Sequence, residues 1–115
     1  MNKNYKQGRV NEEVKRELSN IIRTIKDPRV PELISITAAN VSSDLSYAKI
    51  YVSVIGNYDE KEVKRGLKAA SGYMRKKLGE NLKIRVVPEL TFEIDHSAET
   101  GDRINRILKE IKKED

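Results

Sequence analysis

The 115-residue chain has no cysteine and no tryptophan, and it contains one phenylalanine and one histidine. The absence of cysteine excludes a disulfide framework, a thiol nucleophile and a cysteine-ligated metal site. One histidine, His96, is too few for an ordinary transition-metal site. No apolar run approaches the ~20 residues that a transmembrane helix needs. The first eight residues are polar, which predicts no signal peptide. We therefore expect a cytoplasmic protein with no metal or other cofactor and no membrane partner.

Groups that could perform catalysis are scarce as well. Asp95, His96 and Ser97 are consecutive, but neighbouring side chains on an extended strand point to opposite faces and cannot form a triad. The six glycines are scattered and form no phosphate-binding loop. Carboxylates gather in the last third of the chain, where a solvated surface explains them more simply than acid–base chemistry: Glu80, Glu89, Glu93, Asp95 and Glu99. We expect a binding protein, not an enzyme, with no small-molecule substrate.

The length predicts one domain spanning 1–115, with frayed ends at about 1–6 and 112–115. Hydrophobic residues make up 37% of the chain and charged residues 36%. Both fractions depart from the usual mix of roughly 45–50% and 25%. The core must therefore be small and built mainly from Val, Ile and Leu.

Apolar spacing predicts three helices. The first covers 10–26 and ends at Asp27-Pro28, because the residue before proline disfavours the α region. The second begins after Asp59 as N-cap and runs to about Gly79. Within it, Ala70-Ser71-Gly72 predicts a kink, since a mid-helix glycine costs ~1 kcal/mol relative to alanine. The third covers Ile104–Ile111.

Alternating residues predict three strands. Leu33–Ser43 should place Ile34, Ile36 and Ala38 on one face, and a turn at 43–46 should lead into the strand Tyr47–Ile55. Leu82–Asp95 forms the third, with Pro88 marking an edge or a bulge. The long connection before it permits a parallel pair. We predict a two-layer α+β fold, with helices on a three-stranded sheet.

The net charge of +5 is unevenly distributed along the chain. Residues 61–85 contain nine bases and two acids, a net charge of +7, whereas the other ninety residues carry −2. Lys61, Lys64, Arg65 and Lys68 lie on one helix face, and the basic run resumes after the kink at 75–77. Such a face can follow a phosphate backbone and displace its counterions.

Gly72 fits the same interpretation, because a residue without a side chain lets a sugar-phosphate approach the helix backbone. Alternatives remain open at this point. The basic residues could form a solvated helix face with a packing glycine at Gly72. They could also bind a membrane surface or an acidic protein partner.

Several segments, taken together, cover nearly the whole chain and resemble bacterial ribosome-binding factor A. They occur in the family's order and at compatible spacings. The matching segments are Asp27-Pro28-Arg29-Val30, Ile36-Thr37, Val41 through Ser53, Leu67 through Arg75, Arg85 through Phe92, Asp95-His96-Ser97 and Gly101-Asp102-Arg103-Ile104.

The resemblance implies a type II KH-like domain in which an Ala-x-Gly kink, here 70–72, replaces the Gly-x-x-Gly loop of nucleic-acid-binding KH domains. It also implies a monomeric, non-enzymatic assembly factor that binds 16S rRNA in the free small (30S) subunit. Such a factor assists late 16S maturation, including 5′-end processing, and growth in the cold. The alternative is an adaptor that binds an acidic protein without contacting RNA. The candidates for RNA contact are Lys61, Lys64, Arg65, Lys68, Ala70, Ser71, Gly72, Arg75, Lys76, Lys77 and Arg85. Arg85 is a weaker candidate among them, and so is Arg29 outside this set.

Overall fold

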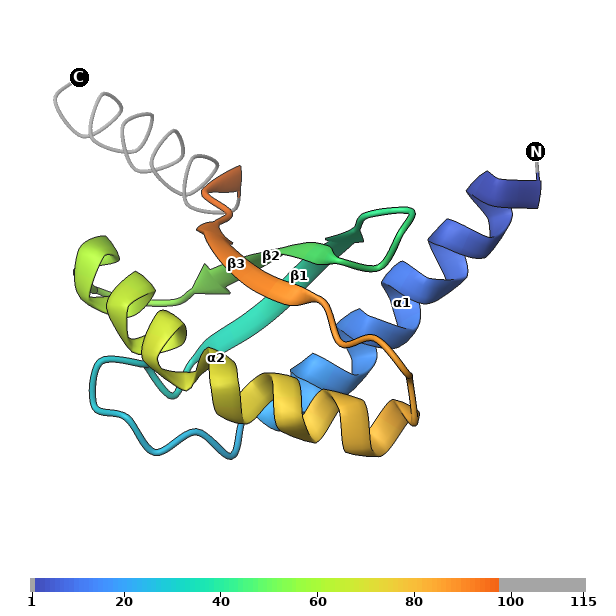
Figure 1. Ribbon diagram of the computed structural model, residues 1–115. Coiled ribbons are helices and arrows are strands. Elements are labelled where there is room, and N and C mark those ends of the chain that lie inside the picture. Colours follow the sequence, from blue (N-terminus) through green and yellow to red (C-terminus); the bar gives the residue numbers. More distant parts are fainter. Residues whose placement is uncertain (1, 98–115) are drawn as a thin grey trace, which may run out of the picture.

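The structure, a computed structural model, describes the backbone of residues 2–97 and the side chains of residues 7–97. The predicted helix at Ile104–Ile111 lies outside these residues. The elements follow the order α1, β1, β2, α2, β3 (Figure 1). Their bounds are α1 Asn2–Ile22, β1 Ile34–Val41, β2 Tyr47–Val54, α2 Glu60–Leu82 and β3 Glu89–Ile94.

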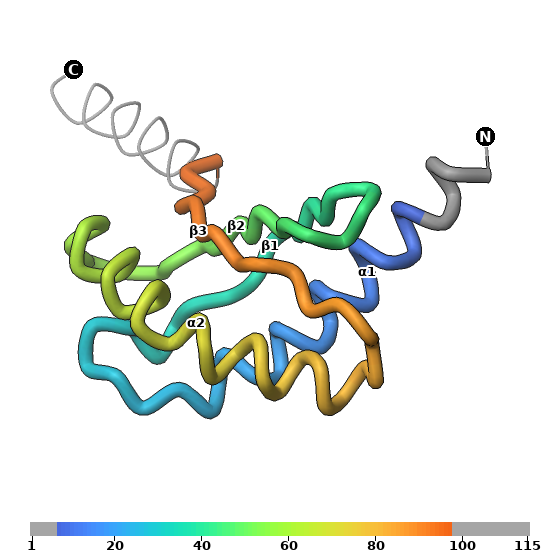
Figure 2. The backbone as a smooth tube through the Cα atoms, viewed as in Figure 1, coloured from blue at the N-terminus to red at the C-terminus, as the bar shows by residue number. Residues whose placement is uncertain are grey.

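The sheet has the strand order β1-β2-β3, with β2 in the centre. β1 pairs with β2 antiparallel, as the predicted turn at 43–46 implies, and β3 pairs with β2 parallel, an arrangement that the long connection permits. α1 and α2 contact each other and pack on the same side of the sheet (Figures 1 and 2). The α+β class and its two layers are therefore confirmed.

The core lies between this sheet face and the two helices. Val, Ile and Leu dominate it, as the composition predicts, and no polar or charged side chain among the described residues is buried. β2 contributes the four positions that alternation predicts, namely Ala48, Ile50, Val52 and Val54. The largest fully buried side chains from the helices are Leu18, Leu67, Met74 and Leu78.

Helix α1 differs from its predicted range at both ends. It begins at Asn2 rather than residue 10, and it ends at Ile22 rather than residue 26. The hydroxyl of Thr24 donates to the carbonyl oxygen of Ile21 at 2.7 Å, and the Thr24 N–H donates to the same oxygen at 2.9 Å. These bonds close the last turn, so Asp27-Pro28 does not end the helix. Asp27 instead pairs with Arg29 at 2.8 Å.

A β-bulge in β1 changes which of its later residues face the core. Ile36 pairs with Val52, but the next pair joins Ala38 to Tyr51, so Thr37 is the extra residue. Ile36 is therefore buried as predicted, whereas Ala38 is exposed and Ala39 is buried. The prediction that Ala38 shares a face with Ile36 is wrong, because a bulge shifts every later residue by one position.

The predicted strand Leu82–Asp95 is too long at its start. α2 continues to Leu82, where Lys83 caps the helix in the left-handed conformation, with φ of 52°. β3 then begins at Glu89, after a buried Pro88. Ile84 and Val86 continue the alternating apolar pattern of β3 backwards, which is why the sequence predicts a strand here. In the structure these residues form the connection between α2 and β3. Within β3 the predicted core positions Leu90, Phe92 and Ile94 are confirmed.

Two local motifs are confirmed by their hydrogen bonds. Asp44 accepts from the hydroxyls of Ser42 and Ser46 at 2.7 Å each, which holds the turn between β1 and β2. Asp59 accepts from the N–H groups of Lys61 at 3.0 Å and Glu62 at 3.3 Å, so it is the N-cap of α2.

The predicted kink is a bend within one continuous helix. α2 has no break in its helical assignment between Glu60 and Leu82, yet its axis changes direction in the yellow middle of the helix (Figure 1). There the Ser71 hydroxyl donates to the carbonyl oxygen of Lys68 at 2.7 Å. Serine back-bonding and a Ser-Gly pair are both recognised causes of helix bending.

Candidate nucleic-acid interface

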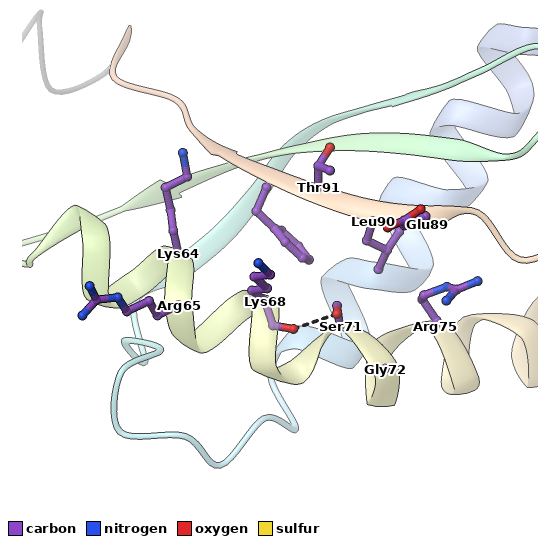
Figure 3. Close-up of a pocket in the computed structure, with 10 residues that line it drawn as sticks. Lys64, Arg65, Lys68, Ser71, Gly72, Arg75, Glu89, Leu90 and Thr91 are labelled. Atoms are coloured by element: carbon purple, nitrogen blue, oxygen red, sulfur yellow. Dashed lines mark hydrogen bonds between the residues drawn. The ribbon is translucent and has the colours of Figure 1, made fainter.

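A groove of about 520 Å³ separates α2 from the edge strand β3 (Figure 3). α2 supplies one wall and β3 the other, so the groove joins residues that are far apart in the sequence. The lining residues are Lys64, Arg65, Lys68, Ser71, Gly72 and Arg75 from α2 and Glu89, Leu90, Thr91 and Phe92 from β3.

The basic wall follows from the helical register of α2. The Asp59 cap starts the helix, and Val63, Leu67, Met74 and Leu78 are buried on the core side. Residues 64, 68, 71 and 75 are separated by four, three and four positions, so they lie along one side of the helix, toward β3. The bend at 71–72 lies midway along this wall.

The wall of β3 presents apolar groups and main-chain polar groups. The N–H of Glu89 donates to Ser46 O, and the N–H of Asp95 donates to Val52 O. Alternate residues of β3 thus bond to β2, which leaves the main-chain groups of Leu90 and Phe92 on the open edge of the sheet. Their side chains are 7% exposed and form an apolar floor.

Some cations in the groove are paired with carboxylates. Lys64 Nζ lies 3.5 Å from Glu93 Oε2, and Arg65 lies 2.7 Å from Glu62 Oε1. All four side chains are substantially exposed, so each pair contributes only about 0–1 kcal/mol. The Lys68 ammonium has no partner among the described residues. An anion entering the groove can therefore recruit all three cations.

Arg75 has a structural contact that the sequence did not reveal. Its Nε donates to Pro88 O at 3.0 Å, and one terminal nitrogen donates to Val87 O at 3.1 Å. The side chain thereby ties α2 to the segment that leads into β3. Since a guanidinium carries five N–H donors, three remain for a ligand.

The glycines of α2 differ in what surrounds them. A Cβ atom at Gly66 would lie 2.9 Å from Arg29 Cβ, and one at Gly79 would lie 2.8 Å from Val87 Cγ2. At Gly72 nothing in the described part of the chain lies within 4 Å. Close packing therefore explains Gly66 and Gly79 and does not explain Gly72. Within residues 7–97, nothing therefore supports the alternative of a packing glycine at this position.

Six of the eleven predicted RNA-binding residues line the groove. Of the other five, Lys61, Lys76 and Arg85 are exposed elsewhere, and Lys77 lies 3.8 Å from Glu80. Ala70 packs partly against the core. The β3 side of the groove was not predicted as part of the site, because only the tertiary pairing places it beside α2.

The described residues hold neither a metal-binding cluster nor a membrane-spanning helix. Within residues 7–97, no group of three or more His, Asp or Glu side chains is arranged to hold a metal ion. Neither helix of that region is long and apolar enough to cross a membrane.

A mixed three-stranded sheet, two helices on one face and small residues at a helix bend beside the edge strand define a KH-like α+β domain. Proteins of similar sequence and structure belong to the same class. The family model for ribosome-binding factor A matches residues 6–108. The chain belongs to the ribosome-binding factor A family.

Individual relatives are similar over most of the chain. Ribosome-binding factor A of Caldanaerobacter subterraneus is 48% identical over an alignment of 113 residues, and the match covers 96% of this chain and 93% of the relative. The crystal structure of the Thermus thermophilus factor has a TM-score of 0.69 at 26% identity, covering 76% of this chain and 94% of that one. A homology model of the T. thermophilus factor, fitted into a cryo-EM map of a 30S–RbfA complex, has a TM-score of 0.64 at 27% identity. That similarity covers 75% of this chain and 91% of that one.

Proposed function

We propose that this protein is a non-enzymatic assembly factor that binds 16S rRNA in the free small (30S) ribosomal subunit through the α2–β3 groove. One observation carries the proposal. The groove combines four cationic side chains with an unhindered Gly72 at the bend of the helix. Family membership and the relative fitted into a 30S–RbfA complex support the same partner.

The groove suits a nucleic-acid backbone for electrostatic and steric reasons. Lys64, Arg65 and Lys68 can each neutralise a phosphate and release condensed counterions. Gly72 leaves space for a sugar-phosphate close to the helix. The protein then acts by holding rRNA in one conformation, and it needs no reaction of its own. We extend the proposal to a monomer in the cytoplasm that assists late 16S maturation, including 5′-end processing and growth in the cold.

A charge-reversal pair of variants tests the groove. Lys64→Glu, Arg65→Glu and Lys68→Glu together should lower co-sedimentation affinity for free small subunits at least 50-fold. Arg75 stays unchanged because it also holds the β3 segment. The control reverses Arg16, Arg23 and Lys26, which are exposed outside the groove, and it causes the same change in net charge. Its affinity should fall less than fivefold.

Two outcomes contradict the proposal. Equal losses in both triple variants would show that only net charge matters and that the groove is not the binding face. Binding to a protein partner that survives complete RNA removal, with no binding to purified 16S rRNA, would favour the adaptor. A third variant, in which Lys61, Lys76 and Arg85 are all changed to Glu, measures how far the interface extends. Its loss of affinity should lie between the loss of the groove variant and the loss of the control variant.

A further inference from the structure

Glu89 is the one carboxylate among the residues that line the basic groove. It is exposed at the start of β3, and its side chain has no hydrogen bond or ion pair among the described residues. In the close-up it lies on the β3 side, beside Leu90 and across from Ser71 and Arg75 (Figure 3). Glu93, further along the strand, is instead paired with Lys64 at 3.5 Å.

An unpaired carboxylate at this position opposes phosphate binding, because like charges repel. An ionised carboxylate has two oxygens that accept hydrogen bonds and no group that donates one. It can therefore contribute to RNA binding only by accepting from donors on the RNA. The donors of RNA apart from the 2′-hydroxyl are on the bases. Single-stranded bases expose their Watson–Crick edges to proteins.

The four bases offer different donors to two adjacent oxygens. Guanine presents N1–H and the N2 amino group side by side, so a carboxylate can bind both. Adenine and cytosine present one amino group beside a ring acceptor, and uracil presents one N–H between two carbonyls. A second acceptor next to a carboxylate oxygen is repulsive, which disfavours uracil most.

We propose that Glu89 selects an unpaired guanine in the groove by accepting from its N1–H and N2 amino group. The inference rests on the proposed function of the groove. The base then lies at the rim of the groove, against the open main-chain edge of β3, while Lys64 and Lys68 neutralise the adjoining phosphates. Glu89 is then the residue that distinguishes sequences, whereas the cations bind any RNA backbone.

The test uses four fluorescent six-nucleotide RNAs, identical uridine runs except for G, A, C or U at one central position. Anisotropy titrations of the full chain should show about tenfold tighter binding of the guanine probe than of the uridine probe, the discrimination expected of one bidentate pair. Glu89→Ala should bind the four probes equally and should bind the uridine probe more tightly than the wild type does.

Glu93→Ala is the matched control, because it removes the same charge from the same strand at a carboxylate that does not itself line the groove and is paired with Lys64. It should bind all four probes more tightly and keep the guanine preference. Equal wild-type binding of the four probes, or a preference that persists in Glu89→Ala, overturns the role of Glu89 and leaves the proposed function intact. Absence of binding to any probe, with small-subunit binding retained, also overturns it. If the wild type binds neither the probes nor the small subunits, the proposed function itself is wrong.

Discussion

The two sides of α2 differ in how closely their glycines are packed. On the side facing Arg29 and Val30, Gly66 lets the chain approach so closely that a Cβ atom would lie 2.9 Å from Arg29 Cβ. On the side facing β3, Gly72 has free space around it, and cations flank it. The same residue type therefore permits close packing at one position and leaves room for a ligand at the other.

Salt should affect the groove side most strongly. If four phosphates are contacted, affinity for the small subunit should fall roughly 50- to 150-fold between 50 and 200 mM monovalent salt. The neutral triple Lys64→Gln, Arg65→Gln and Lys68→Gln should make the plot of log affinity against log salt concentration less steep, by about the contribution of three phosphate contacts. Binding measured at a series of salt concentrations checks both. A slope unchanged in the triple variant would mean that the phosphates bind elsewhere.

Gly66→Ala should disrupt the packing side, with a loss of about 1–3 kcal/mol in the free energy of unfolding. The added methyl group collides with Arg29 Cβ and with Val30 Cγ2, which would lie 3.0 Å away. Urea unfolding followed by circular dichroism measures the loss. Because Gly66 lies outside the groove, small-subunit affinity should stay within twofold where the variant is folded.

Gly72→Ala should have the opposite effect on stability. Its methyl group enters free space, and alanine favours the helix, so we expect a gain of about 0.5–1 kcal/mol by the same urea measurement. Gly72→Leu should keep a stable fold yet weaken binding to small subunits several-fold, because its side chain occupies the space left for a ligand. If Gly72→Leu binds as the wild type does, the backbone at the bend does not face RNA.

Asp27 should have the smallest effect, confined to low pH. Hydrogen bonds from the Arg29 side chain, and then from its backbone N–H, lower the pKa of Asp27 from 3.8 to about 2. Since the folded-state pKa is depressed, this contribution to stability is present above about pH 4 and is lost as the pH falls towards 2. Thermal midpoints of the wild type and Asp27→Asn should therefore differ slightly at pH 6 and converge near pH 2. A difference that persists at pH 2 would assign another role to Asp27.

Local sequence patterns predicted those elements that depend only on residues close together in the chain. The alternation in Tyr47–Val54 identified every buried residue of β2, and the Asp59 cap located the start of α2. The bulge at Thr37 could not be predicted, because it depends on how β1 pairs with β2. Residues 84–88 resembled a strand, although they connect α2 to β3, since parity alone does not distinguish a strand from an extended connection.

The candidate site, too, was predicted in part from local sequence and in part only revealed by the tertiary structure. Helical spacing by itself predicted a basic helix face of Lys61, Lys64, Arg65 and Lys68 that resumes at 75–77, because the helix period is a property of the local chain. The structure places Lys64, Arg65, Lys68 and Arg75 of this set in the groove. Only the tertiary structure decided what faces them. The parallel pairing of β3 with β2 places Glu89 and the open main-chain edge of Leu90 and Phe92 across the groove. That pairing depends on contacts between residues far apart in the sequence, which no local pattern encodes.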